Sequence, residues 1–199
     1  KAGSMHLGDL GINFIFTSAI VGSAISEAVG YSLAIKMKKI NSKVICYHGE
    51  GAMDQGTFWE SLNFSALKKL PILFVCENNG LAIYSDQKKR MKTLDICKKV
   101  KSFGVHTIKI KDNSTKNIFK CTQKALQRIE KNGQPVFLEI NTYREVDHVG
   151  INYDFELGYR KKEKQKMLKS SNELNFLKKK TKNFIKIEKK INKEISKAL

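Results

Sequence analysis

Two short apolar runs, joined by an amphipathic stretch, constrain the fold of this chain most strongly. The runs are KVICYH at residues 43–48 and ILFVC at residues 72–76, and residues 54–69 between them have the apolar spacing of a helix. Nearly continuous apolar strands are typical of parallel sheets whose two faces are both covered by helices. The sequence therefore predicts an α/β fold, a parallel sheet with helices on both faces.

The rest of the chain continues this alternation. We expect further helices at residues 17–38, 94–102 and 115–131, and further strands at residues 105–110 and 136–141. Residues 81–93 are polar and irregular, and residues 144–160 form a long loop that precedes charged helices. The pattern divides the chain into an α/β domain over residues 1–160 and a lysine-rich helical extension over residues 161–199.

Lysine dominates the charge of the chain. The 199 residues include 37 Lys and Arg against 19 Asp and Glu, for a formal net charge of +18. Such a balance invites a nucleic-acid-binding hypothesis, but only four of the basic residues are arginine, which dominates specific base contacts. Residues 161–199 alone hold 14 Lys against four Glu, with isoleucines spaced for one helical face: Ile185, Ile187, Ile191 and Ile195. A solvated helix is favoured, and no nucleic-acid partner is expected.

The cysteines and the start of the chain indicate the kind of cellular compartment in which the chain works. Four cysteines lie far apart without a CxxC pair, which disfavours structural zinc and disulfides and favours a reducing compartment. No apolar stretch approaches the roughly 20 residues of a membrane helix, and the start lacks the pattern of a signal peptide. The chain begins at Lys1 rather than at a methionine, so we expect an N-terminal part of the domain to precede it.

Polar turns follow both apolar runs, where the two strands are expected to end. They are GEGA at residues 49–52 and ENNG at residues 77–80. Ligands of open parallel sheets bind beyond the carboxyl ends of the strands. Glu50 offers an anionic oxygen and Asn79 an amide oxygen, which with a backbone carbonyl make half of an octahedral Mg²⁺ shell. Each of these two sequence patterns alone is common in ordinary turns. The two together predict a site for a phosphorylated cofactor held through its metal.

The stretch from Gly49 to Asn79, GEGAMDQGTFWESLNFSALKKLPILFVCENN, resembles the thiamine diphosphate fingerprint. It is similar to the alpha subunits of the dehydrogenase component of 2-oxo acid dehydrogenase complexes, which include pyruvate, branched-chain and acetoin dehydrogenases. Further motifs follow in family order: GSMHL at 3–7, IVGSAISEAVG at 20–30, CENNGLAIYS at 76–85, TYREVDHVG at 142–150 and GYR at 158–160.

The resemblance implies which residues hold thiamine diphosphate and Mg²⁺. Glu50 and Asn79 would be side-chain ligands of the metal, and the carbonyl of Leu81 would be the third protein ligand. Gly51 and Ala52 would place backbone donors near the diphosphate. The family often has tyrosine at the position of Leu81, a change that a backbone ligand tolerates.

Other matched positions would surround the cofactor. Ala19 and Val21 would contact the aminopyrimidine through main chain, although Val21 could equally be a plain core residue. His148 would be the catalytic residue of this chain; it would reach the diphosphate end of the cofactor and lie on the active-site channel. The alternative is a loop histidine in a local ion pair with Asp147. His6 is a weaker candidate.

Several conspicuous side chains are assigned structural roles. We expect His48 in the core, and Phe58 and Trp59 in the core or at a subunit interface. The charge run at residues 88–90, Lys-Lys-Arg, is interpreted as a solvated loop.

The resemblance also implies a reaction and an assembly. Thiamine diphosphate acts as the electron sink while a small 2-oxo acid loses carbon dioxide, and the acyl group passes to a lipoyl-bearing acyltransferase. The glutamate that activates the cofactor comes from a beta subunit, so an α₂β₂ heterotetramer is expected, in a bacterial-type cytoplasm or an organelle matrix. Val149 stands where relatives of higher organisms have a regulatory serine, so that phosphorylation switch would be absent. The loop around His148 differs from the pyruvate type, which favours another 2-oxo acid.

Three alternatives remain. One is another two-subunit thiamine diphosphate enzyme, of transketolase-like or sugar-modifying type, which a lipoyl-domain acceptance assay would distinguish. The second is a non-catalytic truncated alpha subunit. The third is a basic nucleic-acid-binding protein, which would show an affinity that falls steeply with salt.

Overall fold

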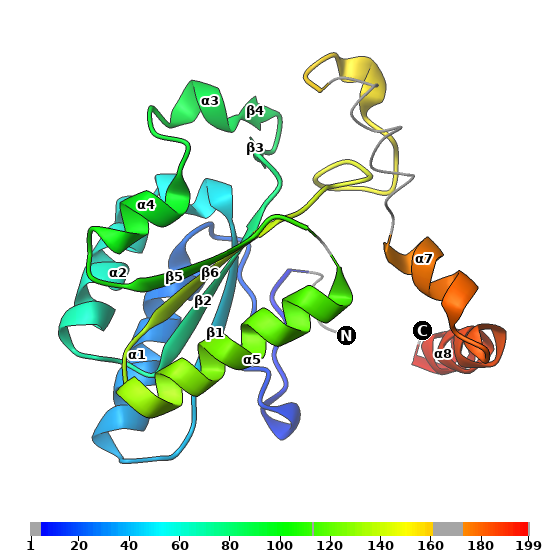
Figure 1. Cartoon of the computed structure of the whole chain (residues 1–199). Helices are drawn as coiled ribbons and strands as arrows, with labels where there is room; N and C mark the ends of the chain where they lie inside the picture. The colour runs from blue at the N-terminus through cyan, green and yellow to red at the C-terminus, as the bar shows by residue number, and fades with distance from the viewer. Residues whose placement is uncertain (1–4, 113, 161–172, 199) are drawn as a thin grey trace. The chain divides into compact units, whose positions relative to one another are not determined.

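The computed structural model describes residues 5–112, 114–160 and 173–198. The chain divides into two compact units, Lys1–Asp154 and Phe155–Leu199. The first unit contains a parallel sheet with its covering helices (Figure 1). The domain boundary at residue 160 stays a prediction.

Four strands of the first unit form one sheet in which all neighbours run parallel. In spatial order they are β1 (Val44–Gly49), β2 (Ile72–Asn78), β6 (Val136–Asn141) and β5 (His106–Ile110). The parallel α/β sheet that the sequence predicts is thus confirmed. Within the described part of the chain β1 pairs only with β2, so β1 forms one lateral edge of the sheet.

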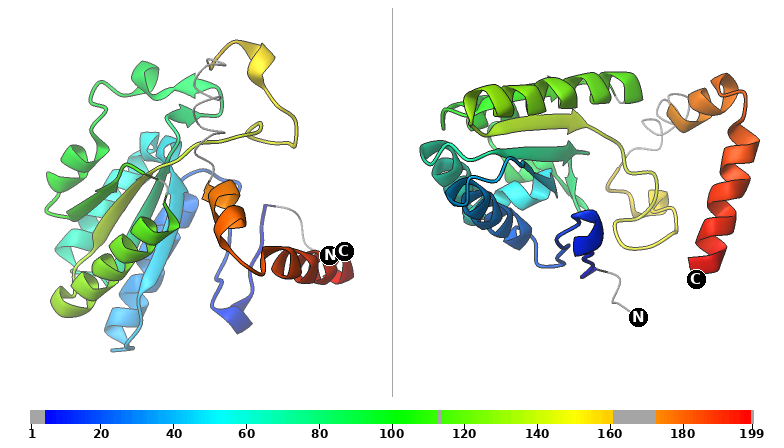
Figure 2. Two further views of the ribbon diagram at one scale, coloured as in Figure 1. Left: turned by 45° about the vertical axis from the view of Figure 1, so that its right-hand side comes forward. Right: turned by 90° about the horizontal axis from the view of Figure 1, so that it is seen from below.

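Helices cover both faces of the sheet (Figure 2). The helices of one face are α1 (Ser23–Met37), α2 (Gly56–Leu67) and α4 (Ile96–Lys101), and the helix of the other face is α5 (Thr115–Asn132). Because successive side chains of a strand point to opposite faces, β2 serves both layers. Its Phe74 joins the apolar cluster under α1, α2 and α4, whereas its Leu73 and Val75 join the cluster under α5.

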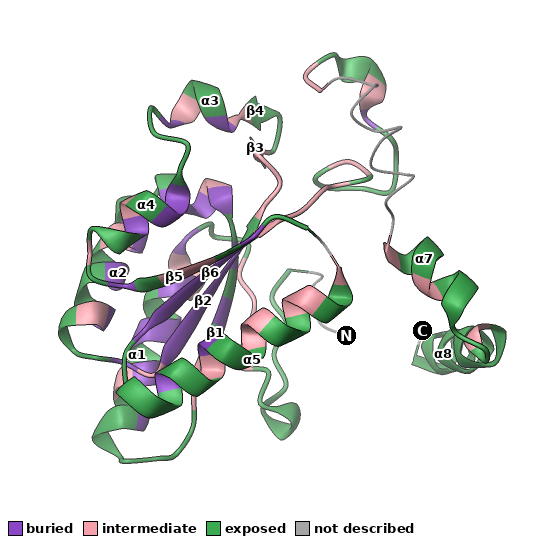
Figure 3. Cartoon of the chain, viewed as in Figure 1, coloured by how far each residue is buried: buried purple, intermediate pink, exposed green. Residues whose placement is uncertain are grey.

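These two clusters form the core of the unit (Figure 3). Phe58 of α2 is fully buried, as predicted, and its ring meets that of Phe137 edge-on at a centroid distance of 6.3 Å. On the opposite face α5 packs on β2, β5 and β6. The side chains of β1 that point to this second face, Ile45 and Tyr47, stay exposed.

Helix α1 begins later than the sequence predicts. The apolar run predicts a helix from residue 17, whereas α1 starts at Ser23. Gly22, at the N-cap, has a φ of 92°, a left-handed conformation that interrupts helical geometry and that glycine adopts without steric cost. The prediction of a helix over residues 17–22 was therefore wrong, and Ile20 and Val21 in this stretch are exposed.

The connections carry short elements. The predicted irregular segment 81–93 contains a two-strand antiparallel ladder and one helical turn, and 3₁₀ turns lie near the N-terminus and after β1. These elements are η1 (Leu10–Ile12), η2 (Glu50–Asp54), β3 (Leu81–Ala82), β4 (Ser85–Asp86) and α3 (Gln87–Arg90).

The described part of the second unit is helical. It contains η3 (Phe155–Leu157), α7 (Glu173–Lys180) and α8 (Phe184–Ala198). Lys178 of α7 forms an ion pair with Glu188 of α8 at 3.2 Å, and the four isoleucines of α8 are exposed. The prediction of charged helices holds here, and its residues 161–172 lie outside the described residues.

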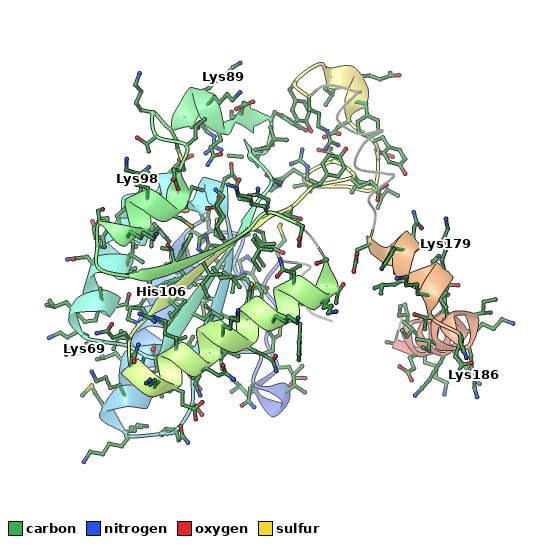
Figure 4. The ribbon with its side chains drawn as sticks, in the orientation of Figure 1. Lys69, Lys89, Lys98, His106, Lys179 and Lys186 are labelled. Atoms are coloured by element: carbon green, nitrogen blue, oxygen red, sulfur yellow. The ribbon has the colours of Figure 1, made fainter. Side chains whose placement is uncertain are left out.

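Lysines point outward from both units. Figure 4 shows the side chains of Lys69, Lys89 and Lys98 extending from the first unit, and those of Lys179 and Lys186 from the second. None of the described helices is long and apolar enough to cross a membrane.

Truncating Leu138 tests the described core. Leu138 of β6 is fully buried under α5. We expect Leu138→Ala to lower the free energy of unfolding by about 2–5 kcal/mol, because the substitution leaves a cavity in a packed interior. Urea unfolding followed by circular dichroism measures this change. Leu67→Ala, the same substitution at a residue that is 72% exposed, should cost less than about 0.5 kcal/mol, and equal losses would contradict the core.

Candidate functional site

The carboxyl ends of β1, β2 and β6 lie side by side. The register pairs Gly49 of β1 with Glu77 of β2, and Asn78 of β2 with Asn141 of β6. The turns that follow β1 and β2 therefore start from neighbouring points, as the sequence predicts. Parallel sheets bind their ligands beyond this end.

Glu50 is a buried carboxylate at this end of the sheet. It opens η2 directly after β1 and is only 1% exposed. Burial raises the pKa of the Glu50 carboxyl above its ordinary value, and the nearby Arg90 guanidinium acts in the opposite direction. Arg90 Nη2 donates to Glu50 Oε1, and Arg90 Nη1 donates to Asp54 Oδ2. One arginine thus joins the two acidic ends of η2 to the end of α3.

The charge run at residues 88–90 is therefore not uniform. Lys88 and Lys89 are exposed, as predicted for a solvated loop. Arg90 is not, because its side chain is 15% exposed and is paired with two carboxylates. The prediction was wrong for Arg90.

Asn78 and Asn79 shape the turn that follows β2. Asn78 Oδ1 accepts a hydrogen bond from the Gly80 N–H at 3.0 Å, and Asn79 Oδ1 accepts one from the Leu81 N–H at 2.9 Å. Gly80 has a φ of 77°, which this tight turn requires and glycine adopts readily. The turn places the amide of Asn79 and the backbone of Leu81 in one short, fixed segment.

Gly51 allows that segment to approach η2. A Cβ atom at Gly51 would lie 2.8 Å from the Cβ of Ala82, closer than two carbon atoms can pack. Strand β3 therefore lies directly against the turn that carries Glu50. Ala52, the next residue of η2, is buried. The structure brings the predicted positions 50, 51, 52, 79 and 81 to one end of the sheet.

A second buried carboxylate, Glu139 of β6, supports the same turn. Its Oε1 accepts hydrogen bonds from Asn78 Nδ2 at 2.9 Å and from Lys109 Nζ at 2.8 Å. Its Oε2 accepts one from the Cys97 thiol at 3.1 Å. Partial burial opposes the charge of Lys109, but Glu139 outweighs burial and raises the pKa of this lysine. The network fastens the Asn79 turn to β6 and β5.

The loop at residues 142–154 is fastened to the segment after β2. Arg144 Nη1 donates to the Ile83 carbonyl at 3.1 Å, and Arg144 Nη2 pairs with Asp154 at 3.2 Å. The Tyr84 hydroxyl donates to Asp147 Oδ1 at 3.4 Å. This loop therefore stands on the same segment that supplies Asn79 and Leu81.

His148 lies in this loop and is exposed. Its backbone N–H donates to Asp147 Oδ1 at 2.6 Å, which fixes the main chain at this point. The roles of His148 as a catalytic and cofactor-binding residue stay predictions. His6 is exposed as well.

Ala19 and Val21 lie in the exposed stretch before α1. Val21 is 60% exposed, so it is not a core residue of the described unit. The adjacent Gly22 lies against the start of α2, because a Cβ there would be 3.1 Å from Gln55 Cγ. The stretch thus reaches the far end of η2, and the contacts predicted for Ala19 and Val21 stay predictions.

The structural roles predicted for His48 and Trp59 are confirmed. His48 is buried, with its ring centroid 5.3 Å from that of Phe58. Burial lowers the pKa of His48 to about 4, although the Gly49 carbonyl opposes this shift, so the imidazole is neutral near pH 7. Trp59 Nε1 donates to the Met53 carbonyl at 2.8 Å.

Sequence reasoning placed Arg90 in a solvated loop and gave no role to two further residues at this end of the sheet, Glu139 and Arg144. Their partners lie far along the chain, since Glu50 is 40 positions from Arg90 and Asn78 is 61 positions from Glu139. One signal was available for Glu139. A glutamate inside the apolar run VFLEIN requires a buried partner, because an isolated charge is costly in a protein interior.

Comparison with known proteins decides the family. The family model described as dehydrogenase E1 component matches residues 1–199. The chain belongs to the dehydrogenase E1 component family. The alpha subunit of acetoin:2,6-dichlorophenolindophenol oxidoreductase from Bacillus subtilis (strain 168) is 30% identical over 148 residues, which are 74% of this chain and 44% of that subunit. The mitochondrial 2-oxoisovalerate dehydrogenase subunit alpha of Caenorhabditis elegans is 33% identical over 141 residues, 70% of this chain and 32% of that subunit.

A solved structure supports the fold of this dehydrogenase E1 component chain. A mutant transketolase from Pichia stipitis superposes with a TM-score of 0.57 at 20% identity, over 63% of this chain and 20% of that chain. At this identity the likeness shows the fold alone, and it agrees with the predicted α/β architecture. The chain spans less than half the length of the two curated relatives.

The contact between η2 and β3 can be tested by adding and removing one methyl group. Gly51→Ala should lower the free energy of unfolding by about 1–3 kcal/mol, because its Cβ overlaps that of Ala82. The double variant Gly51→Ala with Ala82→Gly should recover most of this loss, since the overlap is relieved. Thermal and urea unfolding of all four proteins gives the coupling energy. Additive losses would contradict the close approach.

The counter-charge of Glu139 can be removed at Lys109. Lys109→Met should lower the free energy of unfolding by roughly 2 kcal/mol, because a buried carboxylate loses its partner and Lys109 is partly solvated. Since Glu139 raises the pKa of Lys109, the contribution is present at pH 7 and is lost as the pH rises above about 10.4. Urea unfolding at pH 7 measures the loss. Lys111→Met, at an exposed lysine, is the matched control and should have little effect.

Proposed function

We propose that this chain is the alpha subunit of a thiamine diphosphate-dependent 2-oxo acid dehydrogenase, the subunit that holds the metal and the diphosphate. Its family and the names of its relatives support the proposal. One structural observation carries it: the buried carboxylate of Glu50 lies at the carboxyl end of β1, next to the Asn79 turn at the end of β2. A carboxylate held next to an amide oxygen and a backbone carbonyl offers the hard oxygen ligands that a divalent cation prefers.

The side chains present fit Mg²⁺ bound together with a diphosphate. Glu50 supplies a carboxylate, Asn79 an amide oxygen and Leu81 a backbone carbonyl, all hard oxygen ligands of the kind that Mg²⁺ prefers. An octahedral shell then has room for phosphate oxygens and water. The approach of β3 to η2 across Gly51 supports a shared role for Glu50 and Leu81.

The remaining matched residues would bind and orient the cofactor. Gly51 and Ala52 would donate backbone N–H groups to the diphosphate, and Ala19 and Val21 would contact the aminopyrimidine through main chain. His148 would donate to the diphosphate end from its loop, which Arg144 and Tyr84 hold against the Asn79 segment. When bound, thiamine diphosphate supplies the electron sink for the decarboxylation of a small 2-oxo acid.

The proposed enzyme requires partners. A beta subunit would supply the glutamate that activates the cofactor, in an α₂β₂ assembly, and a lipoyl-bearing acyltransferase would accept the acyl group. The relatives include a bacterial subunit and a mitochondrial one, so we propose a bacterial-type cytoplasm or an organelle matrix as the compartment. The likeness to transketolase is a likeness of fold and does not favour a sugar-modifying reaction.

Removing the charge of Glu50 tests the metal site. Glu50→Gln keeps the size of the side chain but removes the anionic ligand, so Mg²⁺-dependent binding of thiamine diphosphate should fall at least about 100-fold. Isothermal titration of the assembled enzyme, with Mg²⁺ and then with a chelator, measures this affinity. Glu60→Gln, at an exposed glutamate of α2, should bind as the parent does. Unchanged binding in Glu50→Gln would contradict the metal assignment.

The assembly has its own test. We would purify the tagged chain gently from its own cells with Mg²⁺ present and record a native mass spectrum. We expect equal numbers of this chain and a larger partner, with thiamine diphosphate bound. A lone chain without cofactor would contradict the proposal and favour the non-catalytic alternative.

A further inference from the structure

Arg90 is engaged at all three of its nitrogen positions. Nη2 donates to Glu50, Nη1 donates to Asp54, and Nε donates to the Ser85 carbonyl at 3.3 Å. The side chain of Glu50 is 1% exposed and that of Arg90 is 15% exposed. The guanidinium is therefore the cation that compensates this buried carboxylate.

A divalent metal would compete for the same carboxylate. Mg²⁺ binds carboxylate oxygens at about 2.1 Å and demands near-ideal geometry. Glu50 Oε1 already accepts a hydrogen bond from Arg90 Nη2. A guanidinium and a divalent ion on one buried carboxylate would repel each other strongly, because the low dielectric of the interior screens them poorly. The two cations therefore compete for the charge of Glu50.

The place of Arg90 in the chain links this exchange to the other ligands. Arg90 is the last residue of α3, and the Gln87 N–H at the start of α3 donates to the Gly80 carbonyl at 2.9 Å. Gly80 lies between Asn79 and Leu81, inside the turn that the metal would use. Arg90 thus connects η2 to α3, and the hydrogen bond from Gln87 to Gly80 connects α3 to the Asn79 turn.

We propose that Arg90 is the resident counter-ion of Glu50 in the metal-free chain, and that a divalent metal displaces it. The ion bridge holds η2, the Asn79 turn and α3 together before the cofactor arrives. Metal binding then releases Arg90 from Glu50, while Asp54 keeps the guanidinium at the rim of the site. Arg90 is in this sense a positioning residue, and the inference rests on the metal site of the proposed function.

Competition predicts that removing Arg90 makes the metal bind more tightly. We would measure the binding of Mn²⁺, as a probe for Mg²⁺, to the 199-residue chain by the loss of the free Mn²⁺ electron paramagnetic resonance signal. Arg90→Gln should lower the apparent Kd for Mn²⁺ about tenfold, because the carboxylate no longer has to be freed from a competitor. Arg90→Lys keeps one competing charge without the forked geometry, so its Kd should lie between the two.

Two controls separate this effect from others. Lys88→Gln removes the same charge from the same helix at an exposed position without a bond to Glu50, so it should leave the Kd within about twofold, the shift that screened surface charges allow. Glu50→Gln should abolish the tight Mn²⁺ site in the parent and in Arg90→Gln. Equal or weaker binding by Arg90→Gln would overturn the inference while leaving the metal site intact. Absence of the Glu50-dependent site in every variant would overturn the metal site of the proposed function, and the inference with it.

The displacement can also be followed directly. The Nε–H signal of Arg90 in a ¹H–¹⁵N correlation spectrum is assigned by its loss in Arg90→Gln. We expect this signal to shift on titration with Mg²⁺, with the midpoint of metal binding, because the guanidinium changes partners. A signal that does not move while Mg²⁺ binds would contradict the displacement even if the affinities differ.

Discussion

Burying a carboxylate inside a protein costs several kcal/mol unless a cation faces it, and two buried carboxylates at the carboxyl end of this sheet are each paired with a cation from another element. Arg90 forms an ion pair with Glu50, and Lys109 forms one with Glu139. In each pair the two residues come from different elements. The first pair joins η2 to α3, and the second joins β6 to β5 and, through Asn78, to the turn after β2. The apolar clusters build the layers, whereas these two charge pairs join η2 to α3 and the turn after β2 to β6.

The layers could be predicted because each of them depends on local patterns. The apolar runs around Cys46 and Phe74 indicate buried strands whatever the rest of the chain does. The predicted start of helix α1 was wrong for an equally local reason. The small apolar residues before Gly22 have helical spacing, but the left-handed conformation of Gly22 separates them from the helix.

Part of the site could be predicted and part could not. Glu50 and Asn79 follow neighbouring parallel strands, so the sheet topology alone brings them together. Arg90 belongs to a lysine-rich run whose local pattern is that of a solvated loop, and only the tertiary fold shows that it turns inward to Glu50. The role of Glu139 likewise depends on the tertiary fold, since its partners come from β2, α4 and β5. A sequence shows that a buried charge needs a partner, but the fold selects which one.

The lateral edge of the sheet has a practical consequence. Among the described residues β1 offers one side of its backbone to no other strand, and Ile45 and Tyr47 expose apolar surface beside it. A flat, apolar, unpaired strand is a template on which further strands add. A preparation of this chain by itself should therefore aggregate through β1, and faster at higher protein concentration.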